Sequence, residues 1–482
     1  DDIENLDTPN TEDVLSSPED ARNLAGGALN TWWVGTRAWG TGPFYNSLQY
    51  ALLVMADQYS CSWGNFAMRD MSNEPRNTWN NSTSAPDKDV TESIWYGMYR
   101  ANFQANSVLS VLDGGTITLE EEDDKMIRAI CYFIQGSSHG YIANTFDQAF
   151  FSDESTPVEN LLLMPSEDVI PLALEKLDEC IALCNANTFT FDDGWLNGIT
   201  FTNENLGKLA NSYAARIMIQ SARTAAQNDA LDWNRILTYA ENGITEDFYV
   251  IANGLFEDGA TWYDEPKEYL NLPTWARIDC RIINLMDPEY PARYPADGSL
   301  PTVHNGDGQA FSDDARLETD FEFLPSNNFQ PTRGYYHYSH YRSDRYTDNA
   351  MVGVGELMDM RVAENEMMIA EAMARTGNLP GAIGIINAGT RITRGELPEI
   401  DGGANLEEVL DAIFYERDIE LIGAGYGVGY FDMRRRDMLQ EGSLLNWPLP
   451  AQELLVLQLP NYTFGGVANA DGINTSNGGW FK

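Results

Sequence analysis

Two stretches of the chain combine flat aromatic rings with amide, carboxylate and guanidinium groups. Sugar rings present apolar C–H faces and hydroxyl edges, so this mixture of side chains is what a carbohydrate-binding surface needs. Each ring, taken singly, also fits the simpler role of packing a loop onto the core. The candidate ligand-binding residues are Asp57, Tyr59, Trp63, Asn65, Arg76 and Trp79 in the first stretch, and Trp262, Tyr263, Trp275 and Tyr336 in the second.

One short run, residues 136–140 (GSSHG), fits the nucleophile-elbow pattern G-x-S-x-G of hydrolases. That pattern requires a strand, a strained turn and then a helix. Here Ile127, Ile130 and Ile134 repeat at helical spacing, which places the run inside or at the end of a helix. The sequence therefore predicts no serine nucleophile and no catalytic residue.

Patterns that would bind a metal are weak throughout the chain. His337 and His340 are three residues apart, but their surroundings predict strand or loop, where this spacing directs the two rings to opposite faces. Residues 305–308 (NGDG) have the composition of a calcium loop but lack the ligand spacing and terminal glutamate of an EF-hand. We expect no metal and no cofactor, and leave open only a calcium ion at the surface.

Acidic side chains are numerous enough to keep glycoside hydrolysis open as an alternative. That reaction needs two carboxyl groups about 5 to 9.5 Å apart, and the chain has 73 Asp and Glu residues. No particular pair stands out in the sequence. We therefore predict that the protein is not an enzyme, with an all-helical glycoside hydrolase as the alternative.

The charge balance excludes several classes of partner. The 73 acidic residues face only 30 basic ones, for a formal net charge of -43. Such a surface repels phosphate backbones and anionic lipid head groups, so nucleic-acid binding and electrostatic adsorption to membranes are excluded. Any attachment to a membrane must therefore use a lipid or a partner protein.

The sequence offers no segment that would span a membrane. No run approaches the ~18 consecutive apolar residues that a spanning helix requires, and the start lacks the basic and apolar regions of a signal peptide. The polar opening, residues 1–7, is expected to be a tether. The odd number of cysteines, without C-x-x-C spacing, predicts buried thiols instead of a disulfide framework. They are Cys61, Cys131, Cys180, Cys184 and Cys280.

Helical periodicity dominates the first half and returns after about residue 355. Apolar residues at helical spacing over 206–217 and again over 233–244 predict a helical hairpin, whose second helix Asp232 caps. A second hairpin is predicted from the alanine-rich seam over 360–374 and a helix that Pro380 starts. The fold class predicted is mainly α: a TPR-like α-α superhelix of antiparallel helical hairpins with long irregular loops and minor β structure.

Helical periodicity also predicts further helices and the boundaries between regions. Helices are expected at about 18–33, 46–58, 90–113, 122–144, 166–186 and 405–423, the last with a capping box of Asn405 and Glu408. Loops rich in Gly, Pro, Asp and aromatic residues lie between them. The regions are N-terminal helices over 1–245 with a loop at 60–89, an irregular insertion over 246–354, TPR-like hairpins over 355–423 and a loop-rich segment over 424–482.

Four segments resemble motifs of the SusD/RagB family. The most specific is the run AEA-x-x-R-x-G at 370–377, followed by Asn387 and Arg391. The others are 416–421 (ERDIEL) with 430–434 (YFDMR), 448–453 (PLPAQE), and 95–100 (WYGMYR) with Asn106. At 423–427 the chain has GAGYG where the family's Glu-Gly-x-Arg is expected, so it resembles a diverged member. Arg417 lies on an apolar stripe and is expected to pair with Glu420 or Glu416.

The resemblance covers nearly the whole chain and implies one SusD-like domain over 1–482. It implies a lipid-anchored protein on the outer face of a bacterial outer membrane, which binds an oligosaccharide or polysaccharide and delivers it to a SusC-like TonB-dependent transporter. The family binds glycan with loops after the early helices and in the central insertion, which are the regions of the two aromatic stretches. A structural subunit of a surface coat or filament is the other alternative left open.

Overall fold

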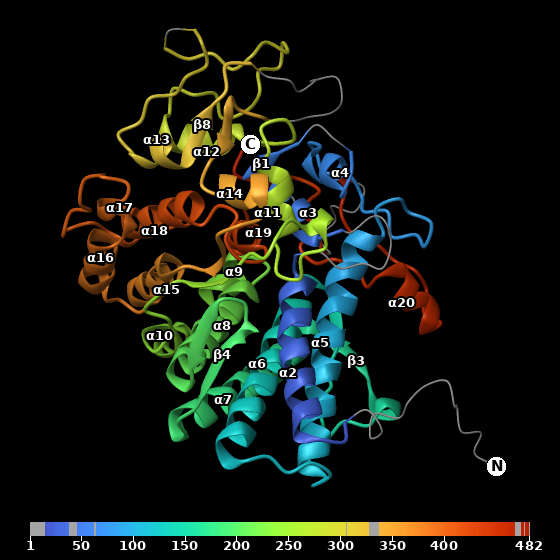
Figure 1. The fold of residues 1–482 in the computed structure, drawn as a ribbon. Helices are drawn as coiled ribbons and strands as arrows, with labels where there is room; N and C mark the ends of the chain where they lie inside the picture. The colour runs from blue at the N-terminus through green and yellow to red at the C-terminus, as the bar shows by residue number, and fades with distance from the viewer. Residues whose placement is uncertain are drawn as a thin grey trace.

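Helices are the main regular structure of the protein, and the strands form only two-stranded antiparallel pairs in the part that the structure describes (Figure 1). The predicted mainly α fold of antiparallel helical hairpins is confirmed. The computed structural model describes residues 15–37, 46–61, 64–304, 306–326, 337–467, 474–476 and 478–481.

Three long helices lie side by side in the N-terminal half (Figure 1): α2 (Pro18–Gly35), α5 (Asp89–Asp113) and α6 (Glu121–Thr145). Helices α2 and α5 approach closely because glycines meet at their contact; a Cβ added at Gly97 would lie 2.8 Å from the Cα of Gly35. Trp32 and Trp33 on α2 are buried in the core. The first half is therefore a rigid layer of helices whose packing depends on small residues.

The superhelix continues as a series of helices, each of which packs on its predecessor. Its members are α7 (Ser166–Ala186), α8 (Asn203–Gln220), α10 (Trp233–Glu241), α15 (Val362–Arg375), α16 (Leu379–Ala388) and α18 (Leu406–Glu420). Their ends agree with the predicted caps. Asp232 accepts a hydrogen bond from the Arg235 amide, and Asn405 and Glu408 form the expected capping box. These helices supply the frame on which the loops are mounted.

Shorter helices complete the frame and the loops. They are α3 (Leu48–Met55), α4 (Met68–Ser72), α9 (Ala225–Asp229), α11 (Glu265–Leu270), α12 (Cys280–Met286), α13 (Arg316–Asp320), α14 (Thr347–Val352), α17 (Thr390–Thr393), α19 (Val428–Arg434) and α20 (Ala451–Val456), with the 3-10 turns η1 (Val158–Asn160) and η2 (Phe256–Asp258). The predicted insertion at 246–354 thus contains short helices between its loops. In Figure 1 its yellow part, with α12 and α13, lies beyond one end of the helical layers.

The strand pairs include local hairpins and pairs that join segments far apart in sequence. The pairs are β1 (Tyr59–Ser60) with β7 (Arg277–Ile278), β2 (Gln148–Phe150) with β3 (Leu163–Pro165), β4 (Thr190–Leu196) with β5 (Ile199–Thr202), β6 (Phe248–Ile251) with β10 (Glu356–Met360), and β8 (Phe321–Phe323) with β9 (Tyr341–Ser343). The β6–β10 pair brings together the two ends of the insertion. The β1–β7 pair, in which Tyr59 lies opposite Ile278, ties the insertion to the loop that follows α3.

Buried ion pairs connect the motif segments. Glu371 of α15 accepts two hydrogen bonds from Arg435, each of 2.7 Å. Arg435 in turn donates to Asp432, which also accepts a 2.7 Å bond from Arg417. The Arg417 partner is therefore Asp432, and the expected pairing with Glu420 or Glu416 is wrong. Those two glutamates are occupied by other arginines.

Three further findings concern the cysteines, the hydropathy of the helices and possible metal ligands. All five cysteines are buried free thiols, as predicted. Among the helices that the structure describes, none is both long enough and apolar enough to cross a membrane. Among the same residues, no group of three or more His, Cys, Asp or Glu side chains is arranged to hold a metal ion.

Candidate functional site

The G-x-S-x-G run lies within α6, as the periodicity predicted. Ser138 is fully buried, Ser137 donates to the carbonyl of Phe133, and His139 Nδ1 bonds to the carbonyl of Gln135. His139 Nε2 accepts a hydrogen bond from the Ser152 amide, so both ring nitrogens are occupied. Burial lowers the pKa of His139 to about 4. These residues pack helices and form no nucleophile site.

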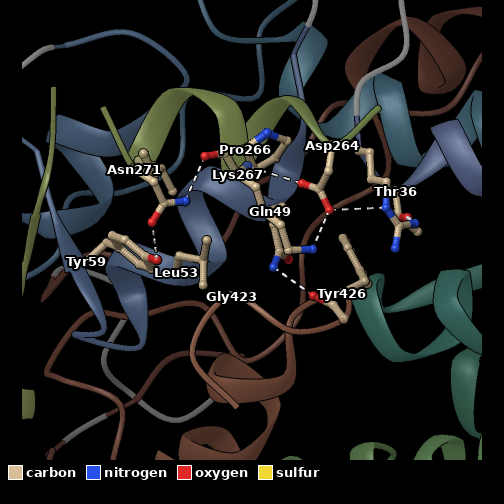
Figure 2. Close-up of a pocket in the computed structure, with 13 residues that line it drawn as sticks. Thr36, Gln49, Leu53, Tyr59, Asp264, Pro266, Lys267, Asn271, Gly423 and Tyr426 are labelled. Carbon is tan, nitrogen blue, oxygen red and sulfur yellow. Dashed lines mark hydrogen bonds and ion pairs between the residues drawn. The ribbon is translucent and has the colours of Figure 1, made fainter. Parts of the chain in front are cut away.

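A small polar cavity lies where α3, α11 and the glycine-rich turn before α19 meet (Figure 2). Its volume is about 20 Å³, which holds a water molecule but no sugar ring. Around it, Lys267 pairs with Asp264 at 2.6 Å, and Tyr59 donates to Asn271 at 3.1 Å, as Figure 2 shows. Gln49 donates to the carbonyl of Gly425. The cavity lies at the buried contact between α3, α11 and the turn before α19, and the hydrogen bonds around it hold α11 in place.

A larger cleft of about 650 Å³ opens on the other side of α11. Residues from α11, η2, α14, the segment before α4 and the loop before β7 contribute to it. Its lining consists of Phe66, Leu255, Phe256, Glu257, Gly259, Glu265, Glu268, Tyr269, Leu272, Trp275 and Ala350. The cleft has the size of a small-ligand site and is mostly apolar, with a few carboxyl groups.

Stacked and edge-on rings form one wall of this cleft. The rings of Tyr269 and Trp275 are stacked with centroids 4.8 Å apart and an interplanar angle of 26°. Phe66 meets Tyr269 edge-on at 5.3 Å and stacks on Tyr50 at 4.4 Å. Trp275 and Tyr269 remain partly exposed, so the ring wall is accessible from solvent. Asn65 is exposed beside it and donates a 2.8 Å hydrogen bond to the Tyr269 hydroxyl.

The backbone at Phe66 is held in an unfavourable conformation. Its φ is 56°, and the next residue, Ala67, has a φ of 58°. Residues with a Cβ disfavour this left-handed region, at a cost of about 1–2 kcal/mol each. The β1–β7 pair and the stack of Phe66 on Tyr50 offset that cost. The strain places the Phe66 ring against Tyr269 and so contributes to the shape of the cleft.

Two carboxyl groups of α11 line the cleft and have unusual proton affinity. Burial, together with Asp264 and Glu257, raises the pKa of Glu265 to about 8 and that of Glu268 to about 7. Glu268 accepts hydrogen bonds from the Phe256 amide at 3.0 and 3.3 Å. Near neutral pH these groups therefore carry protons for much of the time, and they can donate hydrogen bonds to a hydroxyl or carry charge when a cation approaches.

These raised pKa values predict that stability falls with rising pH. The folded state holds the two protons more tightly than the unfolded chain, so the stabilisation is fully present below about pH 4.5 and is lost as pH rises through about 7 to 8. We expect the free energy of unfolding of the Glu265→Gln/Glu268→Gln double variant to decrease less with rising pH than that of the wild type, by on the order of 2 kcal/mol. Urea unfolding at about pH 5 and about pH 8 measures it. The exposed Glu318→Gln, away from the cleft, is the control, and equal slopes for wild type and double variant would contradict the prediction.

Several sequence-predicted site residues have buried structural positions. Asp57 accepts a 2.6 Å hydrogen bond from Arg76 and a 2.7 Å bond from Trp480, and both partners of the ion pair are buried. Tyr59 is buried at the small polar cavity. Trp79 packs edge-on against Trp447 with centroids 5.0 Å apart. The structure therefore places these four predicted residues away from the cleft, where they support the loops.

Trp262 and Tyr263 also pack against the helical frame. The Trp262 ring lies 6.0 Å from that of Trp33, and each of the two predicted residues is 7% exposed. The edge of Trp262 contributes to a separate groove of about 850 Å³, together with Trp195. Trp63 and Tyr336 lie outside the described residues. Asn305 does too, so the surface calcium at 305–308 stays a prediction.

Of the predicted residues, the cleft therefore includes Trp275, with Asn65 at its edge. Sequence reasoning missed Phe66, Tyr269, Glu265 and Glu268. The signal that could have found Tyr269 and the two glutamates is the run 265–270 (EPKEYL), because a proline near its start predicts a short helix on which Glu265, Glu268 and Tyr269 share one face. The two predicted aromatic stretches do meet, through the β1–β7 pair and the Asn65–Tyr269 bond.

Comparisons with known proteins agree with this architecture. Residues 257–449 match the model of the SusD family. A SusD-like carbohydrate binding protein from Bacteroides vulgatus is similar with a TM-score of 0.56 and 16% identity, over 87% of this chain and 84% of that one. A SusD superfamily protein from Bacteroides fragilis has a TM-score of 0.59 and 15% identity, over 93% and 100% of the two chains.

A third similar structure is surface glycan-binding protein A from Bacteroides uniformis, with a TM-score of 0.52 and 15% identity over 96% of this chain and 94% of that one. A comparison with curated protein sequences finds no significant match. The family match covers the insertion, the hairpin with Glu371 and the segment with Arg417, which are the parts that the ion pairs tie together. Residues 257–449 thus carry the sequence pattern of the SusD family, and the chain has the SusD-like fold.

Proposed function

We propose that the protein binds an oligosaccharide in the cleft beside α11, without hydrolysing it. The observation that carries this proposal is the stacked pair of Tyr269 and Trp275 on the wall of an open cleft of about 650 Å³. The stack covers one face of each ring and fixes the orientation of the indole, so the partly exposed Trp275 presents an apolar surface for the C–H face of a sugar. The adjoining Asn65, Glu265 and Glu268 supply partners for hydroxyl groups. Two similar structures, a SusD-like carbohydrate binding protein and a surface glycan-binding protein, support the same class of ligand.

In this proposal the protein acts at the bacterial cell surface as one component of nutrient uptake. A lipid preceding residue 1 anchors it to the outer membrane, and a SusC-like TonB-dependent transporter accepts the glycan. The SusD family match supports this role. The net charge of -43 supports attachment by a lipid, because the protein surface is repelled by anionic head groups.

The position of the carboxyl groups favours binding over hydrolysis. A glycosidase requires one carboxyl group on each side of the scissile bond. Glu265 and Glu268 are three residues apart on α11 and therefore project from the same face of one helix. Burial raises the pKa of both groups, whereas a nucleophile or base has to be ionised at the working pH. The pair thus suits hydrogen bonding to a ligand better than catalysis.

Replacement of Trp275 tests the proposal. We expect wild-type protein to bind a glycan found on a glycan array, and Trp275→Ala to bind the same glycan about 10- to 100-fold more weakly, because the apolar face is removed. Isothermal titration calorimetry measures the change. Trp195→Ala is the matched control, since that partly exposed tryptophan lies in the separate groove.

Two results would contradict the proposal. Equal affinities of wild type and Trp275→Ala, with both proteins folded by circular dichroism, would show that binding occurs elsewhere. Release of shorter sugars from a polysaccharide incubated with pure protein would show an enzyme instead of a binding protein. A soluble monomer in size-exclusion chromatography argues against the coat or filament alternative.

A further inference from the structure

The charged groups that line the cleft are all acidic. Among its described lining residues, Glu257, Glu265 and Glu268 carry carboxyl groups, and none is Lys or Arg. Elsewhere in the described chain, buried carboxylates such as Glu364, Glu371 and Glu416 are paired with arginine. The acids of the cleft thus lack the neighbouring arginine that these buried carboxylates have.

Two of these acids are positioned deep in the wall. Glu268 is 9% exposed, and within the described part of the chain its carboxyl group accepts hydrogen bonds from one backbone amide, that of Phe256. The carboxyl group of Glu265 lies against the hydroxyl of Tyr50, and its buried Oε2 atom has no charged partner among the described residues. A buried carboxyl group is ionised at a low cost only when a cation lies beside it, so a cationic ligand would supply what these two side chains lack.

The adjoining rings favour a positively charged partner as well. The faces of tyrosine and tryptophan rings are electron-rich and attract cations within about 6 Å of the ring centroid. Tyr269 and Trp275 line the same cleft as the three carboxyl groups. Anionic sugars such as uronic acids or sulfated glycans would be repelled by these groups and by the net charge of -43.

We propose that the ligand of this cleft is an amino sugar, an oligosaccharide that presents a free ammonium group to Glu265 and Glu268 while its ring packs on Tyr269 and Trp275. This inference rests on the proposed glycan-binding function and adds its chemical class. The ammonium group supplies the counter-charge that the cleft lacks. A hydroxyl or an acetamido group at the same position of the sugar supplies none.

Binding of the ammonium group also releases protons. Near neutral pH the two carboxyl groups hold protons for much of the time, and an approaching cation favours their ionised form, so the protons pass to the buffer. The cations of the protein beside α11 do not replace the ligand in this role, because Lys267 and Arg37 both pair with Asp264. The other titratable groups nearest the two glutamates are acids or phenols. They are Glu257 on η2, Tyr50 on α3, Tyr269 on α11 itself and Asp348 on α14.

Three oligosaccharides with one backbone test the proposal. Hexamers of β-1,4-linked glucose, N-acetylglucosamine and glucosamine differ only in the substituent at carbon 2. We expect the glucosamine hexamer to bind at least about 10-fold more tightly than the other two at near-physiological salt, which is what one well-placed charged hydrogen bond supplies. Calorimetry in two buffers with different heats of ionisation, at a pH below the pKa of the glucosamine amine so that the ligand binds already as an ammonium, should show proton release for the glucosamine hexamer alone.

Variants separate the cleft from the general attraction of a cation to an acidic protein. Glu265→Gln and Glu268→Gln keep size and hydrogen bonding but remove the charge, and we expect both to reduce the preference for glucosamine to less than about 3-fold. Asp192→Asn is the control, because that exposed carboxylate lies in the separate groove. It should leave the preference unchanged.

The outcomes distinguish this inference from the function on which it rests. Equal affinities for the three hexamers, or a preference that persists in Glu265→Gln and Glu268→Gln, would overturn the amino-sugar assignment. If Trp275→Ala weakens the binding of some other glycan and the glucosamine hexamer does not bind, the glycan-binding function stands and only the amino-sugar assignment fails. If no glycan depends on Trp275, both fail.

Discussion

Glu371→Ala is expected to destabilise the protein by about 3–5 kcal/mol, because it leaves a buried guanidinium without its partner. Glu371 and Arg435 are both fully buried and share two hydrogen bonds of 2.7 Å. Although burial alone would raise the pKa of Glu371, the neighbouring Arg435 lowers it below its ordinary value. The carboxylate therefore stabilises the fold above its usual pKa, and the effect is lost as pH falls through the lowered value.

An exposed partner of the same network is the matched control for this prediction. Arg375 donates to Glu371 at 2.9 Å and to Asp229 at 2.8 Å, and the Asp229 side chain is 70% exposed. Asp229→Ala should change the free energy of unfolding by less than about 1 kcal/mol, since exposed ion pairs contribute little. Urea unfolding near neutral pH compares the two variants. Equal effects would show that the buried pair has no special role in joining the two motif segments.

Helices could be predicted from the sequence because their signals are local. The apolar spacing over 206–217 and 233–244 corresponds to α8 and α10, and the expected helix over 405–423 is α18 with the predicted cap at Asn405. Each of these signals depends on residues three or four positions apart. The mainly α fold follows from them, since helices with one apolar face must pack on one another.

The partners of the charged motif residues could not be predicted in the same way. Arg417 has Glu416 beside it and Glu420 near it on α18, yet it pairs with Asp432 beyond a glycine-rich turn. The nearer acids are excluded because Arg316 binds Glu416 and Arg394 binds Glu420. Spacing along one helix gives the possible neighbours of a side chain, but the choice between them depends on which other helices pack there.

The sequence predicted which kinds of residue form the candidate site, but not which of them face the cleft. Aromatic residues near 57–79 and 262–275 do come together, but the contact depends on the β1–β7 pair, whose strands are more than two hundred residues apart. Sequence cannot distinguish a ring that packs inward, such as Trp262, from one that faces solvent, such as Trp275. The difference arises from the tertiary neighbours of each ring, because Trp262 packs on Trp33 of α2 whereas Trp275 stacks on Tyr269 at the cleft.

Gly136→Ala is expected to destabilise the protein by about 2 kcal/mol, although alanine is the better helix former. A Cβ at Gly136 would lie 2.6 Å from Cγ of Leu177 and 2.8 Å from the backbone oxygen of Ala173. The leucine can move, but the carbonyl is part of α7 and can yield only if the helix shifts. Overpacking of this kind destabilises by about 1–3 kcal/mol. The first glycine of the G-x-S-x-G run is therefore required by helix packing, not by chemistry.

At a glycine without such a neighbour, substitution by alanine should stabilise the protein instead. Gly27 lies in the exposed face of α2, and a Cβ there would meet nothing within 4 Å. Gly27→Ala should therefore stabilise the protein by up to about 1 kcal/mol through helix propensity alone. Thermal and urea unfolding of the two variants, measured side by side, test the argument. If Gly136→Ala were as stable as Gly27→Ala, α6 and α7 would not be in the close contact that the glycine permits.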